Sequence, residues 1–579
     1  MKELDRIYKK AKAWTTIEYD EDTRKEVLDM IDNDEKKLVD AFYKDLEFGT
    51  GGLRGIMGAG TNRMNKYIVG MATQGLSNYL KKKFPSPDIK VAIAYDCRHN
   101  SRYFSEVAAG IFSANGFRVY LFESLRPTPE LSFAIRHLGC QSGIILTASH
   151  NPPEYNGYKA YWEDGGQVTP PHDKNIIAEV RKITTISRIN FNGPRENIIS
   201  IGKEIDDLFT DTVKKISLNP GCIEENHDIG IVYTPIHGTG VKIIPETLRK
   251  FGFTNIINVP EQDITDGNFP TVESPNPEEP EALKMALDKA EETNARIVMA
   301  TDPDGDRLGV AVKNRAGRFV LLNGNQTAAL LTWYILDQRK EKNMLRGNEY
   351  IIKTIVTSGL LDKMAEKYRV ECFNVLTGFK YFANLMEKLG DDRKYIGGGE
   401  ESFGYLPGDY VRDKDAVGSC ALISEMAAYA ACNNKSLFDI LIDIYYEYGL
   451  YREKLEYMVR KGKEGADEID RIMSGFRNDP PLELNNSKVI RINDYLERIS
   501  RDIINNTETV IEKEPGNVLQ FLLKDGSIIS MRPSGTEPKI KFYFSVNDRL
   551  ENKNEYEEKA AKLDRRIADL ARELISDLS

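Results

Sequence analysis

Long apolar runs are missing from this sequence. No apolar stretch reaches the roughly 18 residues that a membrane-spanning helix needs, and residues 1–14 are charged where a secretory signal would carry an apolar core. With 41% hydrophobic residues, 29% charged residues and a net charge of −10, the composition predicts a soluble, cytoplasmic protein. The acidic balance argues against a nucleic-acid partner and gives no reason to expect binding to an anionic membrane.

Cysteine pairs, metal-binding histidine patterns and nucleotide-binding loops are also missing. The six cysteines are scattered singly, without a C-x-x-C pair, which predicts reduced and buried thiols rather than disulfides. The six histidines lack the spacing of metal ligands. No G-x-x-x-x-G-K-[ST] loop occurs, which argues against a P-loop nucleotide site.

A strand–helix–strand–helix–strand pattern occurs three times in the 579 residues, a length that predicts three or four domains. The predicted elements are 89–95, 105–115, 117–122, 129–138 and 143–147; then 230–233, 244–251, 255–259, 280–293 and 296–300; then 350–356, 360–368, 370–376, 381–389 and 394–396. The copies share too little identity to prove duplication, but the order of elements predicts three similar mixed α/β domains. Each third strand runs into a polar loop, and we expect these loops to face one another.

The two ends of the chain differ from the repeats. Residues 1–44 have the pattern of charged helices, and further long charged helices are expected after Tyr445. The last part of the chain then predicts a smaller α+β domain on a largely antiparallel sheet, with strands and a final helix at 510–513, 518–523, 527–531, 539–546 and 556–578. Asp525-Gly526 between two apolar runs is a strong hairpin signal. The predicted domains are 1–203, 204–322, 323–452 and 453–579.

The stretch Thr147–Tyr161 joins a buried strand to a reactive hydroxyl. The apolar run 143–146 leads directly to Ser149, and turn formers follow at once, so the sequence predicts a strand that ends in a tight loop with Ser149 at its tip. Open α/β sheets bind ligands at this end of a strand, which makes Ser149 a candidate nucleophile. His150 and Lys159 follow it. A Ser-His pair alone carries little weight, since such pairs are common in loops.

Glycine and threonine surround Arg54 in the stretch Phe48–Gly55. This composition is typical of a loop whose backbone approaches another group closely. Arg54 would then line an anion site, together with residues 62–65; a flexible connector is the alternative reading.

Three aspartates alternate after the predicted strand 296–300: Asp302, Asp304 and Asp306, with Gly305 between the last two. Carboxylates in such a turn can converge on one hard cation, and Mg²⁺ is the common intracellular one. An EF-hand calcium loop is excluded, because Lys313 occupies the position of its last ligand, a glutamate. A solvated acidic turn is the alternative.

Two further polar loops suit a sugar and a phosphate. Glu400 and Ser402 bring a carboxylate and a hydroxyl into a glycine-rich turn, which suits vicinal sugar hydroxyls, although acidic residues beside glycine are common. Near the C-terminus, a guanidinium, two hydroxyls and a glycine-opened backbone share one short loop: Arg532, Ser534, Gly535 and Thr536. Such a loop suits a phosphate dianion, and a polar hairpin end is the alternative.

Taken together, these motifs resemble those of the α-D-phosphohexomutases, the family of phosphoglucomutase and phosphomannomutase. Four motifs occur in family order between residues 48 and 543, and the Phe48 loop is similar to the longer, phosphoglucomutase/phosphopentomutase-like branch. The resemblance implies a heart-shaped molecule of three similar α/β domains and a smaller fourth. It also implies that Ser149 is phosphorylated, and that Mg²⁺ is held by Asp302, Asp304, Asp306 and Ser149.

The resemblance assigns the remaining residues as well. Arg307 would lie beside the transferring phosphate, and Lys159, ahead of His150, would move a proton to and from the sugar hydroxyl. Thr377, Gly378 and Lys414 match positions near the sugar and its phosphate. Lys541 lies where the family often has arginine, and lysine acts there as a point charge rather than a bidentate donor.

The reaction that the resemblance implies is an intramolecular phosphoryl transfer, of the isomerase class, between glucose 1-phosphate and glucose 6-phosphate. It would pass through a bisphosphorylated sugar, with glucose 1,6-bisphosphate as intermediate and activator. Mannose or pentose phosphates are alternative substrates for the same mechanism. A Mg²⁺-dependent sugar phosphatase and a non-enzymatic sugar-phosphate sensor are alternatives of a different class. Whether the protein is a monomer or a dimer is not specified by the sequence.

Overall fold

The computed structural model describes residues 2–46, 52–85, 88–460, 462–534 and 539–575. The chain divides into two compact units, each described by itself below. The first comprises 1–311, 379–390 and 404–429, and the second comprises 312–378, 391–403 and 430–579. Within the described residues, none of the helices combines the length and the apolar character needed to cross a membrane. The six cysteines are free, as predicted; Cys140 and Cys420 are buried and the other four are partly buried.

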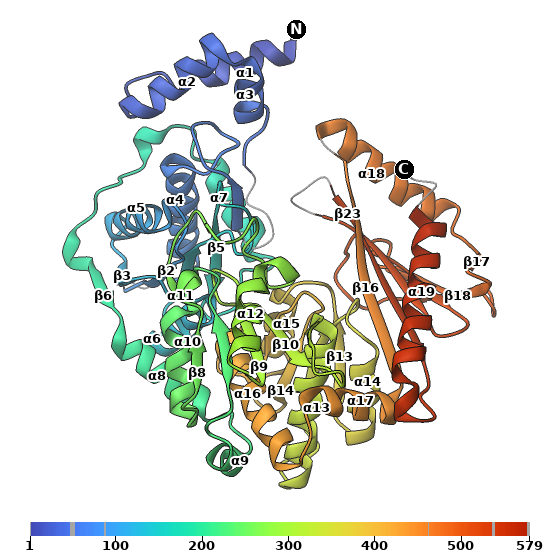
Figure 1. Cartoon of the computed structure of the whole chain (residues 1–579). Helices are drawn as coiled ribbons and strands as arrows, with labels where there is room; N and C mark the ends of the chain where they lie inside the picture. The colour runs from blue at the N-terminus through green and yellow to red at the C-terminus, as the bar shows by residue number, and fades with distance from the viewer. Residues whose placement is uncertain (1, 47–51, 86–87, 461, 535–538, 576–579) are drawn as a thin grey trace. The chain divides into compact units, whose positions relative to one another are not determined.

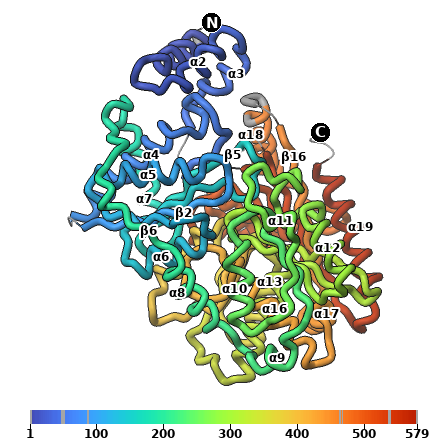
Figure 2. The backbone as a smooth tube through the Cα atoms, turned by 60° about the vertical axis from the view of Figure 1, so that its left-hand side comes forward, coloured from blue at the N-terminus to red at the C-terminus, as the bar shows by residue number. Residues whose placement is uncertain are grey.

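The N-terminal residues form helices, as predicted: α1 (Lys2–Ala13), α2 (Glu21–Asn33) and α3 (Glu35–Phe42). Asp20 and Asp34 begin the second and third of these helices by accepting hydrogen bonds from backbone amides of the first turn. In Figures 1 and 2 the three helices, in dark blue, make a small layer at one end of the first unit. Trp14 attaches this layer, because its ring packs against Phe42 and against Tyr67 of the neighbouring helix α4.

The first sheet has six strands in the order β1-β5-β4-β2-β3-β6. Its strands are β1 (Gly52–Ile56), β2 (Lys90–Tyr95), β3 (Arg118–Phe122), β4 (Ser142–Leu146), β5 (Tyr155–Trp162) and β6 (Ile198–Ile201); its helices are α4 (Lys66–Lys83), α5 (Ser101–Ala114), α6 (Thr128–Leu138) and α7 (His172–Arg181). The strands β2, β3, β4 and β6 pair in parallel, whereas β1 and β5 run antiparallel to their neighbours. All five residues of β4 are buried, as expected for a central strand covered by helices on both faces.

Two stretches predicted as loops are partly strands. Residues 155–162 form β5, so Lys159 lies on a strand rather than in the loop after Ser149. Residues 52–56 form β1, which pairs with β5. Residues 48–51 of the predicted loop lie outside the described part of the chain. The predicted close approach of a glycine backbone is correct at Gly52, where a Cβ atom would lie only 1.9 Å from the carbonyl oxygen of Tyr158.

The second sheet repeats the parallel arrangement. Its central strand β7 pairs in parallel with β8 and with β9, and the described elements of this region are α8 (Lys203–Lys214), α9 (Pro220–Glu225), β7 (Ile231–Thr234), α10 (Gly240–Phe251), β8 (Ile256–Asn258), α11 (Pro260–Asp263), α12 (Lys284–Glu292), β9 (Ile297–Thr301) and β10 (Leu308–Lys313). The strand β9 is buried at all five positions, like β4. Later segments that belong to the same unit are α15 (Lys380–Leu389), β15 (Tyr405–Leu406) and most of α16 (Ala416–Cys432).

The second unit begins with a third parallel sheet. Its strand β12 pairs in parallel with β13 and β14. The elements of this part of the chain are β11 (Phe319–Leu322), which pairs with β10 of the second sheet, and α13 (Gly324–Glu341), β12 (Glu349–Thr354), α14 (Leu360–Tyr368), β13 (Glu371–Val375), β14 (Lys394–Gly399) and α17 (Leu437–Tyr448). Capping boxes begin α13 at Asn323 and α17 at Ser436. Among the described residues, short 3₁₀ helices occur at Ile186–Arg188, Arg195–Asn197 and Pro280–Leu283 in the first unit and at Lys553–Glu555 in the second.

The C-terminal sheet is antiparallel throughout its described pairs, as predicted. Its elements are β16 (Leu450–Val459), α18 (Gly462–Asn478), β17 (Glu483–Leu484), β18 (Ser487–Asp494), β19 (Ile499–Asp502), β20 (Thr507–Val510), β21 (Leu519–Leu523), β22 (Ile528–Pro533), β23 (Lys539–Asp548) and α19 (Tyr556–Ile575). The prediction of helix throughout the charged stretch after Tyr445 is wrong at residues 450–459. They form a half-exposed edge strand, where charged side chains face water and protect the open edge.

Candidate active site

Ser149 lies just beyond the carboxyl end of the buried strand β4. Its backbone has a φ of 52°, in the left-handed region that costs a non-glycine residue about 1–2 kcal/mol. The conformation is held locally, because the amide of Ser149 donates to Oγ1 of Thr147 at 2.8 Å. Strain at a buried serine in such a turn is a common feature of functional sites.

Arg98, which was not selected from the sequence, holds the loop that follows Ser149. Its guanidinium is buried and donates to four backbone carbonyls of that loop: Ser149 at 2.5 Å, Pro152 at 2.8 Å, Tyr155 at 3.2 Å, and Asn151. Asp96 lies 3.4 Å from its Nε atom and supplies the opposing charge. Arg98 follows the end of the parallel strand β2, so the rule that placed Ser149 would also have selected it.

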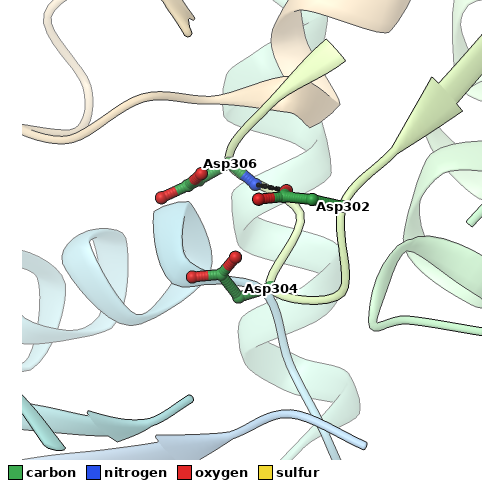
Figure 3. A group of neighbouring side chains, drawn as sticks. All are labelled: Asp302, Asp304 and Asp306. Atoms are coloured by element: carbon green, nitrogen blue, oxygen red, sulfur yellow. Dashed lines mark hydrogen bonds between the residues drawn. The ribbon is translucent and has the colours of Figure 1, made fainter. Parts of the chain in front are cut away.

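The three predicted aspartates come together after β9. Asp302, Asp304 and Asp306 are buried, and each offers a carboxylate oxygen within 4.8 Å of the others (Figure 3). Gly305 makes the turn possible with a φ of 63°. Oδ1 of Asp302 accepts the backbone amides of Asp306 and Arg307, both at 3.0 Å, and the first of these bonds is drawn in Figure 3.

The donor set of this loop fits a hard divalent cation. Oδ1 of Asp304 and Oδ1 of Asp306 are buried and have no hydrogen-bond partner among the described residues. Buried carboxylate oxygens without partners are costly unless a cation or a donor meets them. An all-oxygen set of this kind is what Mg²⁺ and similar cations prefer, and the buried cluster can bind such a metal.

Ser149 meets the acidic loop directly. Its Oγ donates to Oδ2 of Asp302 at 2.7 Å, and Nδ1 of His150 lies 3.3 Å from the same hydroxyl. The polar loops of the first two α/β repeats therefore face each other within the first unit, as predicted.

Two lysines lie against the acidic loop. Nζ of Lys159 is 2.6 Å from Asp304 and 3.5 Å from Asp306, while Nζ of Lys414 is 3.0 Å from Asp306. Burial alone would favour the neutral form of Lys159, but the two carboxylates outweigh it and raise its pKa. Burial also opposes ionisation of Asp304, yet the Lys159 ammonium lowers the pKa of that carboxyl, whereas burial and the two other carboxylates raise the pKa of Asp302.

Lys414 is positioned by residues that were not selected from the sequence. Asp413 accepts from Nζ of Lys414 at 3.0 Å with one carboxylate oxygen. Its other oxygen accepts from the hydroxyl of Tyr161 and from Nε2 of Gln167, both at 2.8 Å. Tyr161 and Gln167 lie 252 and 246 residues from Asp413, which is why no local pattern indicated these contacts.

A strained turn after β7 is hydrogen-bonded to the backbone of the acidic loop. Ile236 and His237 have positive φ values of 44° and 64°, which is costly for a β-branched residue such as isoleucine. The buried imidazole of His237 is bonded at both nitrogens, to the carbonyl of Ile264 at 2.7 Å and to Oγ1 of Thr271 at 2.8 Å. The turn then presents the amide of Thr239, which donates to the carbonyl of Pro303 at 2.9 Å.

Two predicted arginines of the first unit are engaged near Ser149. Nη1 of Arg54 donates to Oδ1 of Asn151 at 3.0 Å, so Arg54 reaches the Ser149 loop from strand β1. Arg307 is ion-paired with Glu278 through Nη1, and its Nε lies 3.9 Å from Asp302.

The second unit holds the predicted sugar-binding residues except Lys414, which lies in the first unit. Glu400 is buried, and Ser402 follows in the same turn after β14. The neighbouring Glu401, not selected from the sequence, accepts from Oγ1 of Thr354 at 3.0 Å. Burial, and then the charge of Glu400, raise the pKa of Glu401 to about 7.

Thr377 and Gly378 lie on a turn of the second unit. Gly378 has a φ of 119° and open space where a Cβ would be, and the buried Oγ1 of Thr377 has no hydrogen-bond partner within the described part of the chain.

The predicted phosphate loop is described only in part, because Gly535 and Thr536 lie outside the described residues. Arg532 lies near the end of strand β22 and pairs in register with Lys541 of β23, so two cations face each other across neighbouring strands. The amide of Ser534 donates to the carbonyl of Lys539 at 2.7 Å. Like charges directly opposite on a sheet are destabilising, and an anion between them relieves the repulsion.

Family models match four segments of this chain. The alpha/beta/alpha domains I, II and III of phosphoglucomutase/phosphomannomutase match residues 45–187, 207–317 and 323–448, and the C-terminal domain of the same proteins matches 491–563. The chain belongs to the phosphoglucomutase/phosphomannomutase family. Membership confirms the predicted architecture of three α/β domains followed by a smaller C-terminal domain.

Relatives in the family extend over almost the whole chain. A phosphoglucomutase of Staphylococcus haemolyticus (strain JCSC1435) is 37% identical over 508 residues, which cover 87% of this chain and 91% of that protein. A phosphoglucomutase of Staphylococcus aureus (strain MRSA252) is 37% identical over 507 residues, covering 88% and 90%.

Solved structures of the family share the fold. A putative phosphomannomutase from Thermus thermophilus has a TM-score of 0.68 at 21% identity and covers 92% of this chain and 99% of its own. The open form of the Paramecium phosphoglucomutase parafusin has a TM-score of 0.67 at 20% identity, covering 92% and 96%.

The candidate residues are distributed over all four family domains. Ser149 and Lys159 fall in the segment matched by domain I, and the three aspartates fall in that of domain II. Glu400, Ser402 and Lys414 fall in that of domain III, and Arg532 in that of the C-terminal domain. In this family member the first two sets meet within one compact unit, and Lys414 joins them there.

Proposed function

We propose that this chain is a phosphohexomutase that interconverts glucose 1-phosphate and glucose 6-phosphate. Family membership and the 37% identical phosphoglucomutases support the reaction class. The single observation that carries the site assignment is the 2.7 Å contact between Oγ of Ser149 and Asp302, because it joins a strained serine to a buried acidic cluster.

In the proposed reaction, phosphorylated Ser149 gives its phosphoryl group to a hydroxyl of the bound sugar monophosphate. The oxygen of that hydroxyl forms the new P–O bond, the bond to Oγ of Ser149 breaks, and the sugar proton passes to a nearby base. Lys159 and then His150 are the candidates for this exchange. Asp304 and Asp306 hold Lys159 as an ammonium, so Lys159 would first give a proton to the departing Oγ of Ser149 and then accept the proton of the sugar hydroxyl. The bisphosphorylated sugar then reverses its orientation in the site and returns its other phosphoryl group to Ser149, which leaves the isomeric monophosphate.

Asp302, Asp304 and Asp306, with the phosphorylated Ser149, would hold Mg²⁺. A divalent cation there supplies positive charge against the phosphoryl oxygens, which carry the developing charge of phosphoryl transfer. Arg307 would meet the same phosphoryl group once it exchanges Glu278 for the substrate.

The second unit would bind the part of the substrate that is not reacting. Glu400 and Ser402 suit the sugar hydroxyls, and Thr377 and Gly378 belong to the same unit, whereas Lys414 would contribute from the first unit. Arg532 and Lys541 suit the distal phosphate, since their facing charges favour an anion. Glucose 1,6-bisphosphate would act as both intermediate and activator, because it can phosphorylate Ser149.

A coupled assay tests this function against its alternatives. Purified protein is given glucose 1-phosphate with Mg²⁺, with and without glucose 1,6-bisphosphate, and glucose 6-phosphate is followed. Mannose 1-phosphate and ribose 1-phosphate in parallel reactions identify a different preferred sugar. Net release of inorganic phosphate without isomerisation would indicate a phosphatase, and binding without turnover would indicate a sensor.

Intact-mass analysis tests the serine independently of the sugar. A phosphate adduct is expected on wild-type protein, and also on the control variant Ser187→Ala, whose exposed serine lies outside the site. The adduct and the mutase activity should both vanish in Ser149→Ala. Full activity in that variant would disprove the assignment.

A further inference from the structure

A cavity of about 580 Å³ lies in the first unit, and none of the candidate active-site residues lines it. Small-molecule sites in proteins have volumes of roughly 300–1,000 Å³, so the cavity is large enough for a ligand of one or two rings. Its wall combines Trp14, which follows the first N-terminal helix, with Leu53 of strand β1 and Ala72 of helix α4. Val180 at the end of α7 and Ile183 complete an apolar interior.

The mouth of the cavity carries charges that cancel. Lys10 and Arg181 are cationic, Glu18 and Asp45 are anionic, and all four contribute to the lining. Lys10 and Asp45 neutralise each other at 2.7 Å. An apolar interior with an electrically balanced polar rim favours an uncharged molecule with an apolar ring body and hydrogen-bonding ends, because burying a net charge there would lack compensation.

Strand β1 separates this cavity from the Ser149 loop. Leu53 lines the cavity, whereas the next residue, Arg54, donates to Asn151 of that loop at 3.0 Å. Successive side chains of a strand point to opposite faces, which explains this division. The same strand pairs with β5, where Gly52 lies opposite Lys159.

We propose that this cavity is an effector site for an uncharged, ring-containing amphiphile, coupled to the catalytic site through strand β1. A ligand that packs on Leu53 immobilises β1 from one face. A substrate whose phosphate meets Arg54 immobilises it from the other. Because each ligand then binds to a strand that the other has already ordered, the coupling is positive.

The uncharged dye 6-propionyl-2-(dimethylamino)naphthalene tests the site, since its fluorescence shifts in an apolar environment. The wild-type protein should bind it in a saturable manner. Thr184→Trp, an exposed substitution at the rim, should weaken binding at least about tenfold. Lys174→Trp, which adds the same ring on exposed α7 outside the cavity, should bind within about twofold of wild type. Absence of saturable binding, or equal affinity in both variants, would overturn the site.

The charge preference is tested with the anionic dye 8-anilinonaphthalene-1-sulfonate. It has a similar ring body, so any difference reports the charge. It should bind the same cavity at least about threefold more weakly than the uncharged dye. Tighter or equal binding that Thr184→Trp abolishes would overturn the assignment of an uncharged ligand.

Coupling is measured by repeating the titration of the uncharged dye with a saturating sugar phosphate, and this step alone rests on the proposed function. The sugar phosphate is the one that the protein isomerises, so a wrong sugar is detected beforehand in the assay. The dye Kd should fall about threefold, and the KM for the sugar phosphate should fall equally when the dye is saturating. In Arg54→Ala the dye should still bind, but its Kd should no longer respond. An unchanged Kd in wild type, or a response that persists in Arg54→Ala, would overturn the coupling.

Discussion

The acidic loop of the first unit and the basic strand pair of the second each gather side chains of one charge, negative in the first and positive in the second. In the first, Asp302, Asp304 and Asp306 are buried against the ammonium groups of Lys159 and Lys414, and carboxylate oxygens remain without donors among the described residues. In the second, Arg532 and Lys541 face each other in register on neighbouring strands. The buried acidic cluster can bind a metal ion, and the proposed function assigns an anion, the distal phosphate, to the strand pair.

The largest effect is expected from Asp304→Asn, which preserves shape but removes one of the three charges. Since a transition state of phosphoryl transfer depends on fixed positive charge beside it, kcat should fall roughly 100-fold or more. Isothermal titration with Mn²⁺ should show weaker binding at the same time. Asp288→Asn, an exposed residue of α12, is the control. Near wild-type kcat and unchanged metal affinity would mean that the aspartates are structural.

Arg532→Ala changes the opposite cluster and should have the next largest effect. Charge-assisted hydrogen bonds are worth about 1.5–3 kcal/mol, so kcat/KM should fall roughly ten- to a hundredfold. The fraction of protein phosphorylated at Ser149 should persist, because the substitution leaves the contacts of Ser149 unchanged. More of the bisphosphorylated sugar should dissociate into solution. Arg491→Ala, on another strand of the same sheet, is the control. Intact substrate affinity with loss of phosphate from Ser149 would contradict the division between the two clusters.

Gly305→Ala tests whether the shape of the acidic loop matters apart from its charge, because it alters the shape without altering the charge. An alanine Cβ would lie 2.8 Å from Cβ of Pro127 and 3.1 Å from Oγ1 of Thr239, at a φ of 63°. A displaced loop should lower Mn²⁺ affinity and kcat about tenfold. Gly317→Ala carries similar backbone strain, with a φ of 75°, but meets no neighbour within 4 Å. Equal effects of the two substitutions on kcat would exclude a role for the close packing.

The residues of these clusters were predictable to different degrees. Ser149 and the three aspartates are contiguous motifs directly after apolar strands, so local patterns reveal them. Arg98 could have been selected from its place after a predicted strand, but the carbonyls that it binds lie 51 to 57 residues away. Tyr161 and Gln167, which hold Asp413, lie 252 and 246 residues from it, and a single sequence does not show such contacts. Their roles became visible only when the sheets brought the segments together.

Secondary structure was predictable where burial set the pattern. The central strands β4 and β9 were predicted because each is buried throughout and contains an apolar run. The strand β5 was missed because it follows turn formers and itself contains Asn156 and Gly157. The strand β16 was missed because an exposed edge tolerates the charges of a helix-like composition. The predicted domain boundaries at 203, 322 and 452 remain predictions.

The smallest effect on rate is expected at Glu401, beside the basic strand pair, where the main effect is a dependence of stability on pH. The pKa of Glu401 is raised to about 7 by burial and by Glu400, whereas a free glutamate titrates near 4.3. The folded protein therefore binds this proton more tightly than the unfolded chain does. The stabilisation is fully present below about pH 4.3, decreases as the pH rises, and is lost above about pH 7, amounting to roughly 3–4 kcal/mol. Glutamine cannot ionise, so Glu401→Gln should remove this dependence.

Hydrogen exchange of the strand β12 measures this dependence locally, since Oγ1 of Thr354 donates to Glu401. Between pH 5 and 8 the opening free energy, corrected for intrinsic exchange, should fall in wild type and stay nearly level in Glu401→Gln. The control Glu366→Gln, an exposed residue of α14, should follow wild type. Parallel profiles for wild type and Glu401→Gln would show that Glu401 is ionised throughout. The carboxylate of Glu401 would then neutralise part of the charge of Arg532 and Lys541. The second unit would no longer carry the excess positive charge that distinguishes it from the acidic loop of the first.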